Sequence, residues 1–258
     1  MNGHIAKAIV LFIALTAVMS VSAAPNLLEQ IKSAGVLKVG TEGTYAPFTF
    51  HDASNALTGF DVEVARAIAA KLGVKAEFIE GKWDGLIAGL DANRYDVVIN
   101  EVTITSARKA KYDFSDTYIV SKAALVVKSG NTAVKTFADL KGKKAAESLT
   151  SNFAQLARSL GAEVVQVDGF NQAVDLVLAG RADATINDSL SFLDFKKQKP
   201  DAPLMAVDFQ KDADAQGVLL RKGNPELLRA INKAIADIKA DGTYLAIARK
   251  YFNEDVSK

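Results

Sequence analysis

The stretch Asp96-Val-Val-Ile-Asn-Glu-Val-Thr-Ile-Thr-Ser-Ala-Arg108 indicates how this chain folds. It begins with a short apolar run, residues 97–99, of the kind found in buried parallel strands. The run turns polar at Asn100 and Glu101, where such a strand reaches the edge of its sheet. The stretch therefore predicts a parallel sheet with polar side chains at the carboxyl end of this strand.

An arginine follows at an unusual position. Thr105 or Ser106 can cap a helix, which puts Arg108 in the first helical turn, where the macrodipole favours an anion over a cation. Local rules are most often broken at functional sites, and an arginine beside free helix N–H groups can receive a carboxylate or a phosphate. The alternative is an exposed arginine paired with a nearby aspartate, and the residues of this stretch alone leave both interpretations open.

The same pattern recurs later in the chain. Arg94-Tyr-Asp-Val-Val-Ile-Asn-Glu101 aligns with Arg181-Ala-Asp-Ala-Thr-Ile-Asn-Asp188 at an offset of 87 residues, and the same offset places Trp83 on Phe170. Chance or shared strand-ending chemistry could produce part of this match. The number of matched positions nevertheless favours two pseudo-equivalent halves.

Strand and helix patterns alternate in both halves, which predicts an α/β fold with parallel sheets. We expect a small hairpin at 49–58 and a helix over 59–72 that ends at Gly73. The other expected elements are strands at 36–39, 76–79, 96–99, 164–167 and 183–186, helices at 83–90, 170–178 and 189–196, and a βα segment within 146–160.

Two β-rich crossings, at 118–128 and around 207–214, are expected to join the halves. The tail from 225 to 251 carries two amphipathic helices, the first with Pro225 at its first position. If the tail packs on the first half, the chain has two lobes and a hinge. The predicted lobes are 27–120 with 211–258, and 121–210.

Residues 1–24 are expected to be a secretory signal peptide. Lys7 precedes an apolar run at 8–21, and Ser22-Ala23-Ala24 resembles a cleavage site. A retained anchor is the minor alternative, because the run is shorter than a bilayer requires. The chain has no cysteine, which excludes a lipoprotein, disulfides and thiolate chemistry. We therefore expect a soluble periplasmic protein.

Composition excludes further classes. Of 31 basic residues, one leaves with the leader, and the remaining 30 balance 30 acidic residues. Such a balance argues against binding to nucleic acid or anionic membranes. His4 lies in the leader and His51 in a polar turn, so we expect no histidine-based triad, no metal site and no cofactor.

The repeat brings several polar residues to one place. Ligands of open α/β sheets bind beyond the carboxyl ends of the strands, so Asn100, Glu101 and Asp188 should face one cleft near Arg108. A cation with carboxylates suits a zwitterion: Arg108 can bind an α-carboxylate, and Asp188 with the Thr103 hydroxyl can hold an α-ammonium. The alternative for Asp188 is a helix N-cap.

Motifs along nearly the whole mature chain resemble the polar amino-acid family of periplasmic substrate-binding proteins that serve ABC importers. They are Thr44-Tyr-Ala-Pro-Phe48, Gly59-Phe-Asp-Val-Glu-Val-Ala-Arg-Ala-Ile-Ala-Ala-Lys-Leu72, Thr103-Ile-Thr-Ser-Ala-Arg108, Tyr112-Asp-Phe-Ser115, Leu140-Lys-Gly142 and Lys222-Gly-Asn-Pro-Glu226.

The resemblance implies a two-lobe periplasmic-binding-protein fold of type II, no enzymatic activity, a permease partner and a monomer. It gives Arg108 the α-carboxylate, Asp188 the α-ammonium and Tyr45 the side-chain pocket, with a hydroxyl from Thr103. Backbone N–H groups at Thr150, Ser151 and Asn152 would complete the carboxylate site, where the family more often has Gly-Thr. The alternative there is a plain N-cap.

Within the family, Glu147-Ser-Leu-Thr-Ser-Asn-Phe153 and Asn187-Asp-Ser-Leu-Ser-Phe-Leu-Asp-Phe195 resemble the cystine- and cysteine-binding branch. That branch often has a neutral residue at Glu101. A carboxylate there suits either the second ammonium of cystine or the cation of arginine, lysine or ornithine. It could instead face solvent or a lysine.

Two further questions stay open at the level of sequence. Tryptophan residues belong to the protein core more often than to a site. The repeat nevertheless places Trp83 at the edge of the cleft, where its ring and that of Tyr45 could lie on either side of a ligand. Cyclohexadienyl dehydratases resemble the family in fold, so Glu101 could alternatively act as a general acid. The amino-acid features favour capture without chemistry.

Overall fold

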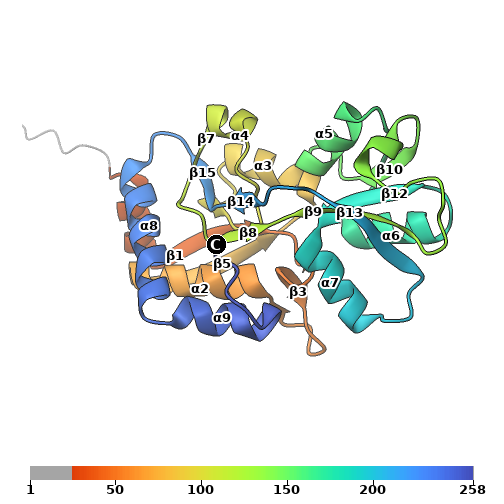
Figure 1. Ribbon diagram of the computed structural model, residues 1–258. Coiled ribbons are helices and arrows are strands. Elements are labelled where there is room, and N and C mark those ends of the chain that lie inside the picture. Colours follow the sequence, from red (N-terminus) through yellow and green to blue (C-terminus); the bar gives the residue numbers. More distant parts are fainter. Residues whose placement is uncertain (1–24, 258) are drawn as a thin grey trace, which may run out of the picture.

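A computed structural model describes residues 25–257, which form two lobes, each built on a five-stranded sheet (Figure 1). The predicted signal peptide lies outside the described residues. The α/β prediction is confirmed. The residue bounds predicted for the lobes stay a prediction.

The first lobe has the strand order β5-β1-β6-β15-β7. The first three strands are parallel, and β15 runs antiparallel to both of its neighbours. The strands are β1 (Val36–Thr41), β5 (Lys75–Glu80), β6 (Val97–Val98), β7 (Tyr112–Phe114) and β15 (Leu219–Arg221), with a hairpin sheet of β2 (Thr44–Tyr45), β3 (Thr49–His51) and β4 (Leu57–Thr58). The helices are α1 (Leu27–Ala34), α2 (Phe60–Leu72), α3 (Trp83–Asp91), α4 (Ser106–Lys111), α8 (Pro225–Ala240) and α9 (Thr243–Phe252).

The second lobe repeats this plan with the order β11-β10-β12-β9-β13. Again three parallel strands are followed by an antiparallel one. The strands are β9 (Ala123–Lys128), β10 (Lys144–Glu147), β11 (Glu163–Gln166), β12 (Ala184–Asp188) and β13 (Leu204–Phe209). The helices are the 3-10 turn η1 (Phe137–Leu140), α5 (Asn152–Ser159), α6 (Phe170–Leu178) and α7 (Ser189–Gln198).

The predicted repeat is confirmed by this topology. Strand β6 lies beside β1 as β12 lies beside β10, and α3 and α6 are both nine residues long and begin 87 positions apart. The first predicted crossing, 118–128, contains β8 (Ile119–Ser121). The return crossing is β14 (Asp214–Gln216), which shares only Asp214 with the predicted range because residues 207–209 belong to β13; β8 and β14 pair antiparallel between the lobes. This two-stranded connection is the geometry of a hinge.

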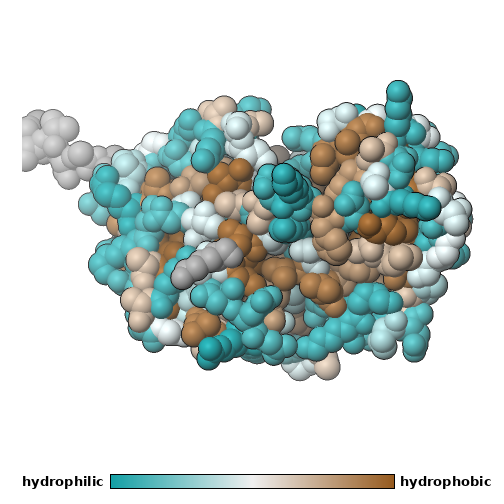
Figure 2. Space-filling view, viewed as in Figure 1, coloured by the Kyte–Doolittle hydropathy of each residue, from teal (hydrophilic) through white to brown (hydrophobic). Residues whose placement is uncertain are grey.

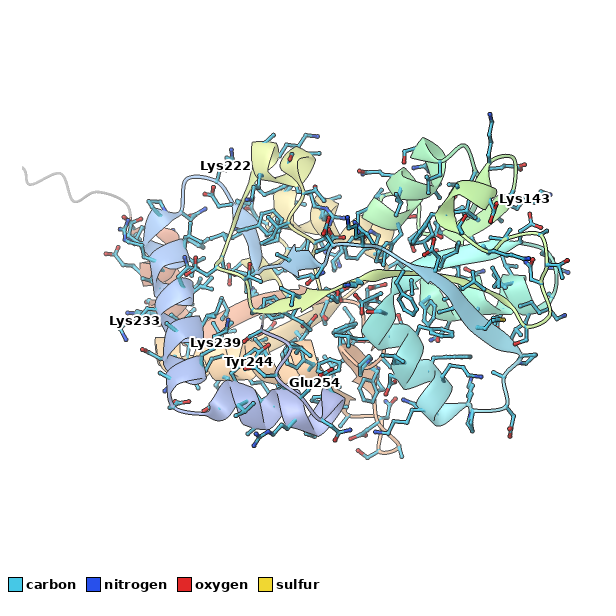
Figure 3. The ribbon with its side chains drawn as sticks, viewed as in Figure 1. Lys143, Lys222, Lys233, Lys239, Tyr244 and Glu254 are labelled. Atoms are coloured by element: carbon cyan, nitrogen blue, oxygen red, sulfur yellow. The ribbon has the colours of Figure 1, made fainter. Side chains whose placement is uncertain are left out.

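The tail packs on the first lobe through an aromatic cluster around Phe60 of α2. The Phe60 ring is fully buried and lies 5.1 Å from the ring of Phe252 and 5.8 Å from that of Tyr244. Figure 3 shows Tyr244 near the inner side of the tail and Lys233 projecting outward from α8. Aromatic pairs of this kind add to the free energy gained by burying their area.

Hydrophilic residues cover most of the face seen in Figure 2, with apolar residues between them. None of the helices within residues 25–257 is long and apolar enough to cross a membrane. Glycines end or begin helices where the backbone demands them: Gly73 ends α2 at φ 79°, as predicted. A side chain at Gly59 would meet the carbonyl oxygen of Phe48 at 2.2 Å.

Candidate functional site

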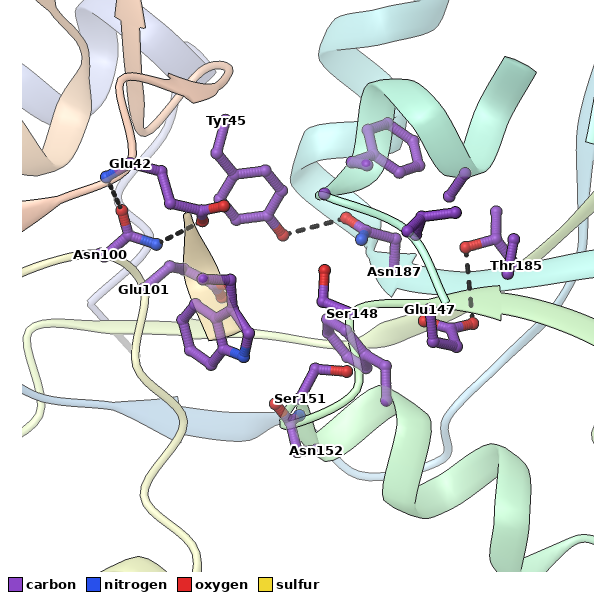
Figure 4. Close-up of a pocket in the computed structure, with 17 residues that line it drawn as sticks. Glu42, Tyr45, Asn100, Glu101, Glu147, Ser148, Ser151, Asn152, Thr185 and Asn187 are labelled. Carbon is purple, nitrogen blue, oxygen red and sulfur yellow. Dashed lines mark hydrogen bonds between the residues drawn. The ribbon is translucent and has the colours of Figure 1, made fainter. Parts of the chain in front are cut away.

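A cavity of about 490 Å³, counting its open mouth, lies between the lobes (Figure 4). The Tyr45 hydroxyl of the first lobe donates a hydrogen bond of 2.9 Å to Asn187 Oδ1 of the second lobe. The polar residues that line the cavity are Glu42, Tyr45, Asn100, Glu101, Glu147, Ser148, Ser151, Asn152, Thr185 and Asn187.

Arg108 supplies a buried cation next to this cavity. Thr105 caps α4 by accepting from the Arg108 amide, which confirms the predicted helix start. The guanidinium donates through Nη1 to the Thr103 carbonyl at 2.9 Å, while the buried Nη2 has no partner among the described residues. Burial lowers the pKa of Arg108 to about 10, so it stays charged at neutral pH.

Trp83 connects this cation to the cavity. Its ring lines the cavity, and the Arg108 guanidinium carbon lies 5.2 Å from the ring centroid. The indole Nε1–H is also buried without a partner among the described residues. Unpartnered buried donors are rare and costly, so two beside each other point to an anionic group that both could bind.

Carboxyl groups line the same cavity. Glu42 follows β1 and is fixed by Asn100, whose Nδ2 donates to its Oε2 at 2.7 Å and whose Oδ1 accepts from its amide at 2.8 Å. Burial raises the pKa of Glu42 to about 7, although the bond from Asn100 opposes the rise. Glu147 ends β10 and accepts from the Ile186 amide, and burial raises its pKa well above the ordinary value.

Glu101 and Asp188 meet where the lobes join. Ser121 of β8 bonds to Glu101 Oε1 at 3.0 Å and to Asp188 Oδ2, and Gln216 of β14 donates to the Ser121 hydroxyl at 3.1 Å. Burial, followed by repulsion from Asp188, raises the pKa of Glu101 well above its ordinary value. Burial also raises the pKa of Asp188, which hydrogen bonds from Ser121 and Glu101 oppose. The two carboxyls therefore act as a coupled pair.

The backbone of Glu101 is itself unusual. Its φ is 51°, in the left-handed region that non-glycine residues seldom occupy. Its amide donates to the Tyr118 hydroxyl, which donates in turn to Asp61, a fully buried acid whose pKa burial raises to about 7. Strain of this kind is concentrated at ligand sites and switches.

Six of the ten residues predicted for the site line the cavity: Tyr45, Trp83, Asn100, Glu101, Ser151 and Asn152. Arg108 is not among the residues that line the cavity, and its guanidinium lies over the ring of Trp83. Thr103 is buried and offers its carbonyl to Arg108, while its β-bridge partner is Gln216. Ligand contacts of all these residues stay a prediction.

Two residues that were predicted to contact the ligand form hydrogen bonds with other protein groups in the structure. Asp188 is 1 % exposed, caps α7 by accepting from the Leu190 and Ser191 amides, and is not among the lining residues. Thr150 donates to Asp84 of the first lobe through its amide and its hydroxyl, each at 3.0 Å. Ser151 caps α5, the N-cap role that the sequence left open.

The sequence reasoning missed Glu42 and Glu147 as site residues. Both directly follow or end parallel strands, β1 and β10, so the rule used for Asn100 and Glu101 would have found them. No group of three or more His, Asp or Glu side chains within residues 25–257 is placed to hold a metal ion.

Residues 37–254 match the family of bacterial extracellular solute-binding proteins, family 3. The chain belongs to this family. Among family relatives, the L-cystine-binding protein TcyA of Bacillus subtilis (strain 168) is 45% identical over 234 residues, 90% of this chain and 87% of that protein. Such relatives are solute-binding proteins and not enzymes, which supports the prediction of a non-enzyme.

Two solved structures are similar to this chain over most of its length. An ancestral arginine-binding protein bound to arginine gives a TM-score of 0.80 at 44% identity, covering 84% of this chain and 98% of that one. The L-cystine solute receptor of Neisseria gonorrhoeae in the unliganded open conformation gives 0.60 at 45% identity, covering 91% and 100%. Identity is nearly equal in the two comparisons, and the score is higher with the ligand-bound structure than with the open, unliganded one.

Proposed function

We propose that this chain captures a free amino acid between its lobes, with L-cystine or L-cysteine as the preferred ligand, and delivers it to an ABC permease. The observation that supports capture of an amino acid is that unpartnered buried donors, at Arg108 and Trp83, occur together with the carboxyl pair of Glu101 and Asp188. A zwitterion matches both sides at once. We further propose a periplasmic monomer released by cleavage of residues 1–24, without a lipid anchor.

In this proposal Arg108 binds the α-carboxylate with its free Nη2, and the first turn of α5 at Asn152 supplies amide donors from the opposite lobe. The α-ammonium binds at Glu101 and Asp188, where it would break the contact between the two carboxyls. Tyr45 and Trp83 flank the rest of the ligand, and Thr103 offers its hydroxyl nearby.

Cystine is preferred because TcyA and the gonococcal receptor, both at 45% identity, bear that ligand in their names, and because the loops at 147–153 and 187–195 resemble that branch. The second candidate is a basic amino acid. It is favoured by the buried Glu42 on the cavity wall and by the arginine-bound ancestral structure. Both ligands carry a second cationic group that Glu42 or Glu147 could bind.

A thermal-shift panel separates these candidates. At a hundred times its dissociation constant, the true ligand should raise the melting temperature by about 5–10 °C. The panel compares cystine, cysteine, arginine, lysine, histidine and glutamine, and mass spectrometry identifies any amino acid that co-purifies. If only basic amino acids shift the melting temperature, the preference for cystine is wrong.

A reductant provides an internal control. Because the chain contains no cysteine, dithiothreitol cannot change its covalent structure. We expect dithiothreitol to change the shift caused by cystine, since it converts cystine to cysteine, and to leave any shift caused by arginine unaltered. A cystine shift that persists at full reduction would assign cysteine as an equally good ligand.

A further inference from the structure

Asp84 is the second residue of α3 in the first lobe, and its side chain forms hydrogen bonds with the second lobe. Its Oδ1 accepts from the Thr150 amide and hydroxyl, each at 3.0 Å, and its Oδ2 accepts from the Leu149 amide at 3.2 Å and Gln166 Nε2 at 3.4 Å. All four donors belong to the opposite lobe. A carboxylate matches this set because every group that faces it is a donor.

The loop that Asp84 holds belongs to the proposed carboxylate site. It runs through residues 148–151 into α5, and Ser148, Ser151 and Asn152 line the cavity. On the first-lobe side, Asp84 follows Trp83, whose ring carries the Arg108 guanidinium. Asp84 therefore ties together the two halves of the anion receptor, although it is not among the residues that line the cavity.

Other contacts across the cleft are weaker candidates for this role. The ion pair of Lys82 with Asp168 is a single contact between side chains that are 71% and 49% exposed. The Tyr45–Asn187 and Ser191–Ala46 contacts are single hydrogen bonds. Asp84 combines four bonds, of which three go to two consecutive residues of one loop.

We propose that Asp84 is the latch of the closed form: its carboxylate holds the lobes together and positions the loop at 148–151 without touching the ligand. The role of the loop rests on the proposed function, whereas the contact between the lobes does not. Opening the cleft must break all four bonds, so the latch acts on the rate at which ligand leaves. Association begins from the open form, in which these bonds are absent.

Asp84→Asn keeps the shape of the side chain but turns an amide N–H toward donors. We expect ligand dissociation to become about tenfold faster, with little change in the association rate. Trp83 is the only tryptophan in the chain and adjoins Asp84, so stopped-flow tryptophan fluorescence measures both rates. Asp84→Glu keeps the carboxylate and should restore part of the slow dissociation.

The matched control is Asp91→Asn on the same helix. Asp91 accepts from the Tyr112 hydroxyl at 2.7 Å within the first lobe, so its loss leaves the contacts across the cleft intact. We expect wild-type rates in this variant. Equal dissociation rates in wild type and Asp84→Asn would overturn the latch while leaving the proposed function standing.

A second readout does not depend on the ligand. Lys222 and Lys143 project from opposite lobes (Figure 3), and Lys222→Cys with Lys143→Cys introduces the only cysteines for spin labels. We expect Asp84→Asn to reduce the short-distance population relative to wild type and Asp91→Asn, with or without amino acid. Identical distance distributions would refute the latch even if no amino acid bound, an outcome that would separately refute the proposed function.

Discussion

Replacing Arg108 with alanine is expected to abolish measurable binding of every amino acid while the protein stays folded. Arg108 is 8% exposed, and no ion pair to its guanidinium is formed among the described residues. A buried carboxylate that loses its partner costs about 3–5 kcal/mol, whereas a micromolar complex has only about 8 kcal/mol in total. Affinity should therefore fall by roughly a hundredfold to a thousandfold or more.

Isothermal titration calorimetry measures this loss, and circular dichroism checks the fold. Lys109→Ala is the matched control, because Lys109 is the exposed next residue of the same helix and removes the same charge. Arg108→Lys should recover only part of the affinity, since a lysine cannot bind a carboxylate with two parallel bonds. Unchanged affinity in Arg108→Ala would exclude the carboxylate role of Arg108.

Most of the fold could be predicted from the sequence because it depends on local patterns. The alternation of short apolar runs with helical periodicity fixed the element order, and the offset of 87 residues predicted which elements are equivalent. The start of α4 at Thr105 and the end of α2 at Gly73 followed from capping chemistry. These features involve residues that lie close together in the chain.

The site was harder to predict because its contacts join distant residues. Nothing local in the sequence indicates that Thr150 donates to Asp84, 66 positions away, rather than to a ligand. Asp188 caps α7 and also lies near the carboxyl group of Glu101. The sequence could not show that the Ser121 hydroxyl bonds to both of these carboxyl groups. Glu42 directly follows β1, so the rule that ligands bind beyond the carboxyl ends of parallel strands could have identified it. The Gly-rich loop that contains Glu42 made the end of this strand difficult to recognise in the sequence.

Binding of the amino acid is expected to release a proton at mildly acidic to neutral pH. Glu101 comes from the first lobe and Asp188 from the second, and burial together with their mutual repulsion raises the pKa of Glu101 well above 4.5. The pair therefore retains a proton when no cation lies between the two groups. An α-ammonium at this position favours the ionised pair, so the proton leaves as the ligand binds.

The direction of the pH dependence of the affinity follows from this difference in protonation between the free protein and the complex. Above pH 4.5 and below the raised pKa, the free form holds a proton that the complex has lost, so the affinity increases with pH. One released proton corresponds to about a tenfold increase in affinity per pH unit, and the increase stops once pH exceeds the raised pKa. The charged and titratable groups that face Glu101 are Asp188, Asp61, Arg108, Tyr45 and Tyr118.

Glu101→Gln isolates this proton. Its amide can donate to Asp188 as the protonated carboxyl does, but it has no proton to release. Calorimetry at pH 6 in buffers of different ionisation enthalpy counts the protons, and Glu77→Gln, at an exposed acid on β5, is the control. Because burial also raises the pKa of Glu42, that group can add its own proton, and the decisive quantity is the difference between wild type and Glu101→Gln. Equal proton release in the two proteins would show that the ammonium binds away from the Glu101–Asp188 pair.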